Sequence, residues 1–90
     1  MSDGLVRETL EDAILRVFGE VWRAERGGEP PPMTAETVLL ETGLDSMGFA
    51  ILVAELDAQL GYDPFALATE MYYPQTFADF LAFYEKHRPA

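Results

Sequence analysis

Hydrophobic residues recur at helical spacing through the first third of the chain. They fall on one helical face, at steps of three or four positions with two adjacent pairs, and charged residues stand among them: Val6, Leu10, Ile14, Val17, Phe18, Val21 and Trp22. This pattern predicts an amphipathic helix over residues 4–24 or so. Ser2 or Asp3 is suited to cap its first turn, and Gly27-Gly28 is expected to end it.

A loop and a return to the core follow this helix. The stretch "ERGGEPPPMTAE" holds three consecutive prolines, which cannot continue a helix because proline lacks an N–H donor. The next stretch, "TVLLETGL", is expected to enter the core through Val38, Leu39 and Leu40. Gly43 is expected to take a backbone conformation that other residues resist.

A second helix is predicted from Asp45 or Ser46, both good N-cap residues, to about Leu60. Gly61 is suited to end it. The helix is apolar on most sides, through Met47, Phe49, Ala50, Ile51, Leu52, Val53, Ala54, Leu56 and Leu60. Because the core needs only one stripe of a helix, we expect apolar surface to be left over.

The last third of the chain predicts two more helical segments. Asp63-Pro64 is typical of the start of a short helix or turn, which Pro74 is expected to break. A final helix is predicted from Thr76, with Asp79 as its capping partner. It is expected to bury Phe77, Phe80, Leu81 and Tyr84 and to place Lys86, His87 and Arg88 in its last turn. Together these elements predict an all-α fold, a small four-helix bundle with three main helices and one short helix, in a single domain of residues 1–90.

Charge is distributed unevenly along the chain. The formal net charge is −10, and the span from Gly27 to Glu85 contains no Lys or Arg but ten Asp and Glu residues. Such a field repels nucleic acid and anionic membrane surfaces and attracts basic protein faces. Solubility is the alternative reading of the same charge. We expect a protein partner and no nucleic acid.

Several kinds of chemistry are disfavoured by the composition. The chain has no cysteine, and its one histidine, His87, lies near the end of the last helix, so neither a thiol nucleophile nor a Ser-His-Asp triad is supported. The carboxylates lack calcium-loop spacing, which disfavours a built-in metal site. The longest apolar run, Phe49 to Ala54, is too short to span a bilayer. We expect a cytoplasmic protein that is not an enzyme and does not insert into membranes.

Ser46 raises the question of what an unactivated serine at a helix start is for. Its plainest role is an ordinary N-cap. A helix N-terminus is also an anion site, because its free N–H groups and dipole favour negative charge, so a phosphodiester on Ser46 would be stabilised there. Met47, the next residue, is either an exposed and adaptable docking side chain or a core contact.

The stretch "GLDSM", followed by an apolar helix ending in "ELDAQLG", resembles the acyl carrier proteins and related thiolation domains. The resemblance covers nearly the whole chain and implies the four-helix bundle of that family. It also implies that a phosphopantetheinyl transferase attaches 4′-phosphopantetheine to Ser46. Asp45 matches the aspartate that helps hold the magnesium ion of the transferase. The thiol of the arm would then carry an acyl group as a thioester.

The chain departs from the bacterial fatty-acid carriers at two places. Those proteins have acidic residues two and five positions after the serine, where this chain has Gly48 and Ile51. The difference favours a specialised carrier over a housekeeping one. Its expected partners are an acyl-activating ligase, an acyltransferase or a condensing enzyme with a basic face. The residues expected to dock on such a face are Met47, Phe49, Ile51, Glu55 and Asp57.

The expected function is therefore a stand-alone, monomeric acyl carrier in a dedicated lipid (fatty-acid) or secondary-metabolite pathway. The cargo chain could fold into the bundle, lined by residues such as Val53, Leu56, Met71 and Phe77. Two alternatives stay open. One is an aminoacyl or peptidyl carrier of a nonribosomal pathway. The other is a helical adaptor in which Asp45 and Ser46 only cap a helix.

Overall fold

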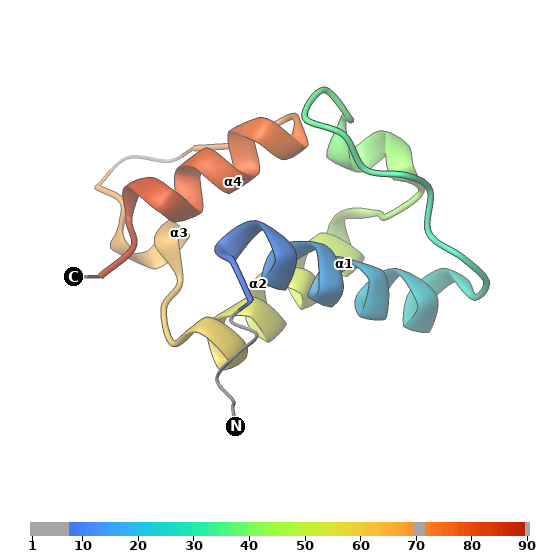
Figure 1. The fold of residues 1–90 in the computed structure, drawn as a ribbon, viewed down its shortest axis with the longest axis horizontal. Helices are drawn as coiled ribbons and strands as arrows, with labels where there is room; N and C mark the ends of the chain where they lie inside the picture. Colours follow the sequence, from blue (N-terminus) through green and yellow to red (C-terminus); the bar gives the residue numbers. More distant parts are fainter. Residues whose placement is uncertain (1–7, 70–71, 90) are drawn as a thin grey trace.

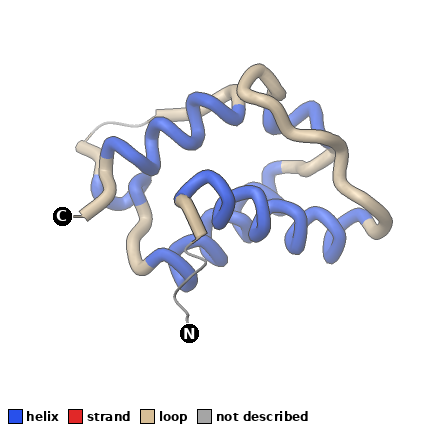
Figure 2. The backbone as a smooth tube through the Cα atoms, in the orientation of Figure 1, coloured by secondary structure: helices blue, strands red, loops and turns tan. Residues whose placement is uncertain are grey.

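The predicted all-α fold is confirmed by a computed structural model, which describes residues 8–69 and 72–89 (Figures 1 and 2). No strand occurs within those ranges. The described residues form a small bundle with three main helices, a short α3 and a 3₁₀ turn, η2. In chain order these are α1 (Leu10–Arg26), η2 (Leu39–Thr42), α2 (Ser46–Leu60), α3 (Pro64–Leu67) and α4 (Phe77–Lys86).

One core joins these elements. Helix α1 packs against both α2 and α4, and Figure 1 shows α2 passing behind α1 while α4 runs along the other side. Leu56 and Phe80 are completely buried where the helices meet. The buried cluster as a whole consists of Leu10, Ile14, Val17, Phe18, Val21, Leu39, Leu44, Leu52, Leu56, Tyr62, Phe77, Phe80 and Tyr84. Its first five members lie on the predicted stripe of the first helix.

The start of α1 differs from the prediction. The helix begins at Leu10, and the Thr9 hydroxyl accepts a hydrogen bond from the Asp12 N–H at 3.0 Å. Glu8 and Thr9 lie outside the helix, so the predicted start near residue 4 is wrong. The reason is that a threonine N-cap satisfies one of the free N–H groups of the first turn. Ser2, Asp3 and Val6 lie outside the described residues.

The long connection between α1 and α2 is fixed at both ends of η2. The Leu39 N–H donates to the Gln75 carbonyl at 2.9 Å, and the Phe77 N–H donates to the Thr37 carbonyl at 2.8 Å. The indole N–H of Trp22 donates to the Thr42 carbonyl at 3.0 Å. These bonds tie the segment before α2 to both α4 and α1.

Only one of the two adjacent leucines of η2 enters the core. Leu39 is 3% exposed and Leu40 is 61% exposed. The prediction that both are core residues is therefore wrong for Leu40. Neighbouring positions of a tight helical turn point in different directions, so two such leucines cannot share one buried face.

The two remaining helices begin as predicted but differ in other details. Asp63 caps α3 by accepting from the Phe65 N–H at 2.9 Å, and Pro64 is its first residue. The helix ends at Leu67, well before Pro74, so Pro74 is not what ends it. In α4, Leu81 is only half-buried, whereas Phe83, which was not predicted to be buried, is 7% exposed.

A complete capping box starts α4. The Thr76 hydroxyl accepts from the Asp79 N–H at 3.1 Å, and Asp79 Oδ2 accepts from the Thr76 N–H at 3.3 Å. The hydrogen bond from the Thr76 N–H holds the pKa of Asp79 below its ordinary value of 3.8, and the hydrogen bond from the Gln75 N–H lowers this pKa to a smaller extent. A carboxyl whose pKa is lowered in the folded state stabilises the fold above its unfolded pKa, and this contribution is lost as the pH falls through the folded pKa.

We predict that Asp79→Asn lowers the melting temperature at neutral pH because it removes the charged acceptor. The difference from wild type should shrink as the pH falls from about 5 to about 2, where the wild-type carboxyl is itself protonated. Thermal unfolding followed by circular dichroism across this range measures it. A difference that stays constant down to the lowest pH would contradict the assigned role of the Asp79 charge.

Candidate functional site

Ser46 is the first residue of α2 and is exposed to solvent. Asp45 precedes it as the N-cap, and its Oδ1 accepts a hydrogen bond from the Gly48 N–H at 2.9 Å. The first backbone bond of the helix runs from the Phe49 N–H to the Asp45 carbonyl at 2.9 Å. The cap therefore comes from Asp45, and the Ser46 side chain is not used for it. Within residues 8–69 and 72–89, no group is hydrogen-bonded to the Ser46 hydroxyl.

The backbone around this hydroxyl suits a negative charge. The N–H groups of Ser46 and Met47 belong to the first turn and have no acceptor in the described part of the chain. The positive end of the helix dipole lies at the same place. These features fit a phosphodiester on Ser46 Oγ, since donors, dipole and an accessible oxygen coincide. The described residues contain no group of His, Asp and Glu side chains arranged to hold a metal ion.

A buried leucine supports the site from below. Leu44 is 2% exposed and lies under the first turn of α2. A Cβ on Gly48 would stand 2.6 Å from Leu44 Cδ1 and 2.8 Å from Leu44 Cγ, so only glycine leaves room for the leucine. Gly43 has φ 101°, which confirms the predicted unusual backbone. The glycine in place of an acidic residue at position 48 therefore has a packing cause.

The predicted docking residues separate into two groups. Met47 is 67% exposed beside Ser46, and Glu55 and Asp57 are exposed farther along α2. Ile51 is half-buried and lines a shallow groove between α1 and α2. Phe49 is also only half-buried, and its ring meets Phe65 and Phe80. The expectation that Phe49 lies on the exposed face is wrong.

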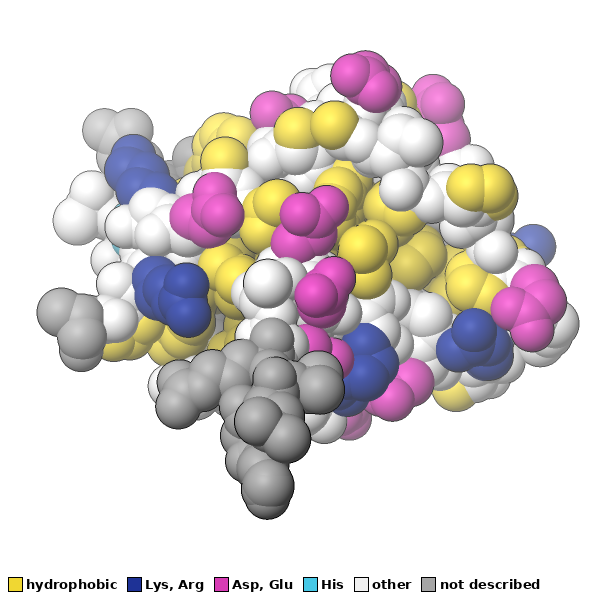
Figure 3. All heavy atoms as spheres, in the orientation of Figure 1, with side chains coloured by type: hydrophobic (Ala, Val, Ile, Leu, Met, Phe, Trp, Pro, Cys, Tyr) yellow, Lys and Arg dark blue, Asp and Glu magenta, His cyan; other side chains and the backbone are white. Residues whose placement is uncertain are grey.

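The groove beside Ile51 includes residues that the sequence did not reveal as neighbours of the site. Glu55 lines it from α2, and α1 contributes Glu20, Val21, Ala24 and Glu25. The acidic face of α2 thus continues onto α1. On the opposite side, where α1 and α4 lie in front of α2, acidic side chains are also spread among exposed hydrophobic atoms (Figure 3).

The residues expected to line a cargo chain are already packed. Leu56 is 0% and Phe77 3% exposed, and both belong to the core cluster. Val53 is half-buried against that cluster. Met71 lies outside the described residues.

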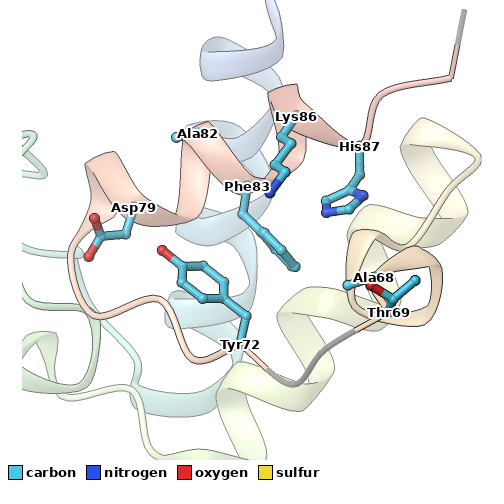
Figure 4. Close-up of a pocket in the computed structure, with 8 residues that line it drawn as sticks. All are labelled: Ala68, Thr69, Tyr72, Asp79, Ala82, Phe83, Lys86 and His87. Carbon is cyan, nitrogen blue, oxygen red and sulfur yellow. The ribbon is translucent and has the colours of Figure 1, made fainter.

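A hollow of about 500 Å³ lies along α4 (Figure 4). The rings of Tyr72 and Phe83 meet there with centroids 4.6 Å apart, and the His87 ring meets Phe83 at 4.8 Å. Lys86 stands at the same end as His87, while Asp79 stands at the other. His87 ends α4 and is half-buried against Phe83, which agrees with a structural role. None of these residues is among the predicted site residues.

Comparison with known proteins identified no relative. No family model, curated protein or solved structure matches the chain. No helix in the described ranges is long and apolar enough to cross a membrane.

We predict that Gly48→Ala destabilises the fold by about 1–3 kcal/mol, because the new methyl group overlaps Leu44 in a packed site. Gly19→Ala in α1 is the matched control. There the new Cβ meets only the far end of the Arg23 side chain, at 3.2 Å, so the change should be neutral or stabilise by up to about 1 kcal/mol. Urea unfolding of both variants measures the difference. Equal effects at the two positions would contradict the role given to Leu44.

Proposed function

We propose that the chain is a carrier protein that is modified on Ser46 with 4′-phosphopantetheine. The observation that supports this most is the exposed Ser46 hydroxyl at the start of α2, which the cap leaves unused. In the proposed modification, Ser46 Oγ bonds to the phosphorus that bears the pantetheine arm in coenzyme A. The pyrophosphate P–O bond breaks, adenosine 3′,5′-bisphosphate leaves, and the hydroxyl proton passes to a base of the transferase. Once attached, the group supplies a terminal thiol that carries an acyl group as a thioester.

Asp45 has two proposed tasks at this site. Its Oδ1 caps α2 through the Gly48 N–H, which orients the first turn and with it Ser46. Oδ2 makes no hydrogen bond within the described part of the chain, and the residue is exposed, so this oxygen can reach a magnesium ion bound to the transferase. Carboxylate oxygen is the ligand type that magnesium prefers.

The partners we propose are enzymes with basic docking faces: the transferase, and an acyl-activating ligase, acyltransferase or condensing enzyme. Exposed Met47 beside Ser46 offers an adaptable apolar contact. The acidic residues of α2 and the neighbouring α1 face supply long-range attraction, which steers encounter and weakens as salt rises. The pathway we propose is a dedicated one for lipids or secondary metabolites.

We predict that incubation with coenzyme A, magnesium and a promiscuous phosphopantetheinyl transferase adds one phosphopantetheine to the wild-type protein. Ser46→Ala should gain nothing, because it lacks the attacking oxygen. Ser2 is the only other serine, so Ser2→Ala is the matched control and should be modified like wild type. Intact mass spectrometry reads out all three. An unmodified wild type would instead favour the helical adaptor.

In the same assay, Asp45→Asn separates the two tasks of Asp45. Asparagine caps helices about as well as aspartate, so the melting temperature should stay close to wild type. The modification rate should fall by at least roughly tenfold, since a charged contact to the metal is lost. An unchanged rate would remove Asp45 from the magnesium contact without affecting the assignment of Ser46.

We further predict that Met47→Glu lowers kcat/KM for the transferase by about threefold or more, because the docking contact is replaced by a charge. Ala58→Glu makes the same charge change at an exposed position about three turns away on α2 and is the control. For wild type, kcat/KM should fall as the salt concentration rises. Equal effects of the two substitutions would show that docking does not use the Met47 end of the helix.

A further inference from the structure

The ring of Phe49 turns from the site into the bundle. Phe49 lies three residues after Ser46, so the two residues are neighbours on the surface of α2. Its ring meets Phe65 at 6.1 Å with an interplanar angle of 76°, and Phe80 at 5.6 Å with an angle of 69°. These are edge-to-face contacts of the kind that aromatic pairs prefer. The Phe49 side chain thus links the first turn of α2 to both α3 and α4.

More rings fill the space behind Phe49. Phe80 and Tyr84, both 0% exposed, lie 4.8 Å apart between ring centroids. Phe65 meets Phe83 at 4.8 Å and Tyr84 at 6.3 Å. The Tyr62 hydroxyl donates to the Tyr84 carbonyl at 2.7 Å and holds the far end of the cluster. The region between α2, α3 and α4 is therefore a continuous aromatic cluster that starts directly inside the site.

Such a cluster resists an aliphatic chain. A chain that entered beside Ser46 would have to displace Phe49 and then Phe80. The apolar area that the chain buried would be offset by the buried area that those two rings lost. Crowding a packed interior also strains its side chains. A short or polar group on the arm has little apolar area to bury, so it stays in solvent.

We propose that the Phe49 ring closes the interior of the bundle to the cargo, so that this chain carries short or polar acyl groups, aminoacyl groups included, rather than long alkyl chains folded between α2 and α4. The inference rests on the proposed function. It names the class of cargo and makes Phe49 the residue that sets it.

The test compares acetyl and octanoyl cargo on the same protein. Wild type is loaded from acetyl- or octanoyl-coenzyme A with a promiscuous phosphopantetheinyl transferase and magnesium, and loading is confirmed by intact mass. Cleavage of each thioester by hydroxylamine is then timed and divided by the rate for the same thioester on free pantetheine. A thioester that enters the bundle is cleaved more slowly, because hydroxylamine reaches it only during the fraction of time for which it is exposed.

For wild type we expect the two normalised rates to agree within about twofold, and the melting temperature to be the same with either cargo. In Phe49→Ala, the opened space should slow octanoyl cleavage relative to acetyl cleavage. Leu40→Ala, which removes an exposed apolar side chain from the segment just before α2, is the matched control and should behave as wild type.

Octanoyl protection of about tenfold or more in wild type would overturn the inference while leaving the carrier function intact. If no acyl group is transferred to Ser46, the proposed function fails and the inference fails with it. Should Phe49→Ala not fold, the wild-type comparison decides alone, because it requires no variant.

Discussion

The start of α2 depends on the contact between Leu44 and the first turn of that helix. Leu44 fills the place where any side chain on residue 48 would stand. With glycine there, the Gly48 N–H reaches Asp45 Oδ1 and the helix begins at Ser46. Because the leucine takes up the buried side and the aspartate the cap, the serine is left on the surface with its hydroxyl free of both tasks.

The rest of the molecule holds this arrangement in place. Trp22 fixes Thr42 from α1, and backbone bonds at Leu39 and Phe77 fix the preceding segment to α4. An exposed residue on a firmly anchored segment can be presented to an enzyme at little cost in conformational entropy. The anchoring also explains why a long proline-containing loop is compatible with a defined site.

The charge and the aromatic cluster give the two sides of α2 different roles. Toward solvent, Met47, Glu55 and Asp57 form an acidic face with an apolar contact next to Ser46. Toward the interior, Phe49 begins a series of ring contacts that reaches Tyr62 at the end of α2. In the proposed function, partners meet the solvent-facing side of α2 while the other side keeps the bundle closed.

Local features of the sequence were sufficient to predict the all-α fold and the capped starts of α2 and α4. Gly61 and Thr76 act within one turn of their own position, so their roles follow from residue type and spacing. For α2 the sequence predicted a cap at Asp45 or Ser46, and the structure selects Asp45. The predicted start of α1 was wrong because several polar residues could serve as its cap, and only the structure selects Thr9. The exposure of Ser46 could not be predicted from the sequence either, because the start of a helix can be buried or exposed.

By itself, the sequence determined the regions in which α2 and α4 begin and that the region of Ser46 is acidic, because both depend on neighbouring residues. The direction of Phe49 and the exposure of Leu40 were decided only by the tertiary structure. Helix α2 is apolar on nearly every side, so no stripe in its sequence marks the buried face. That face was set by which helices pack against it, and the packing joins residues far apart in the chain.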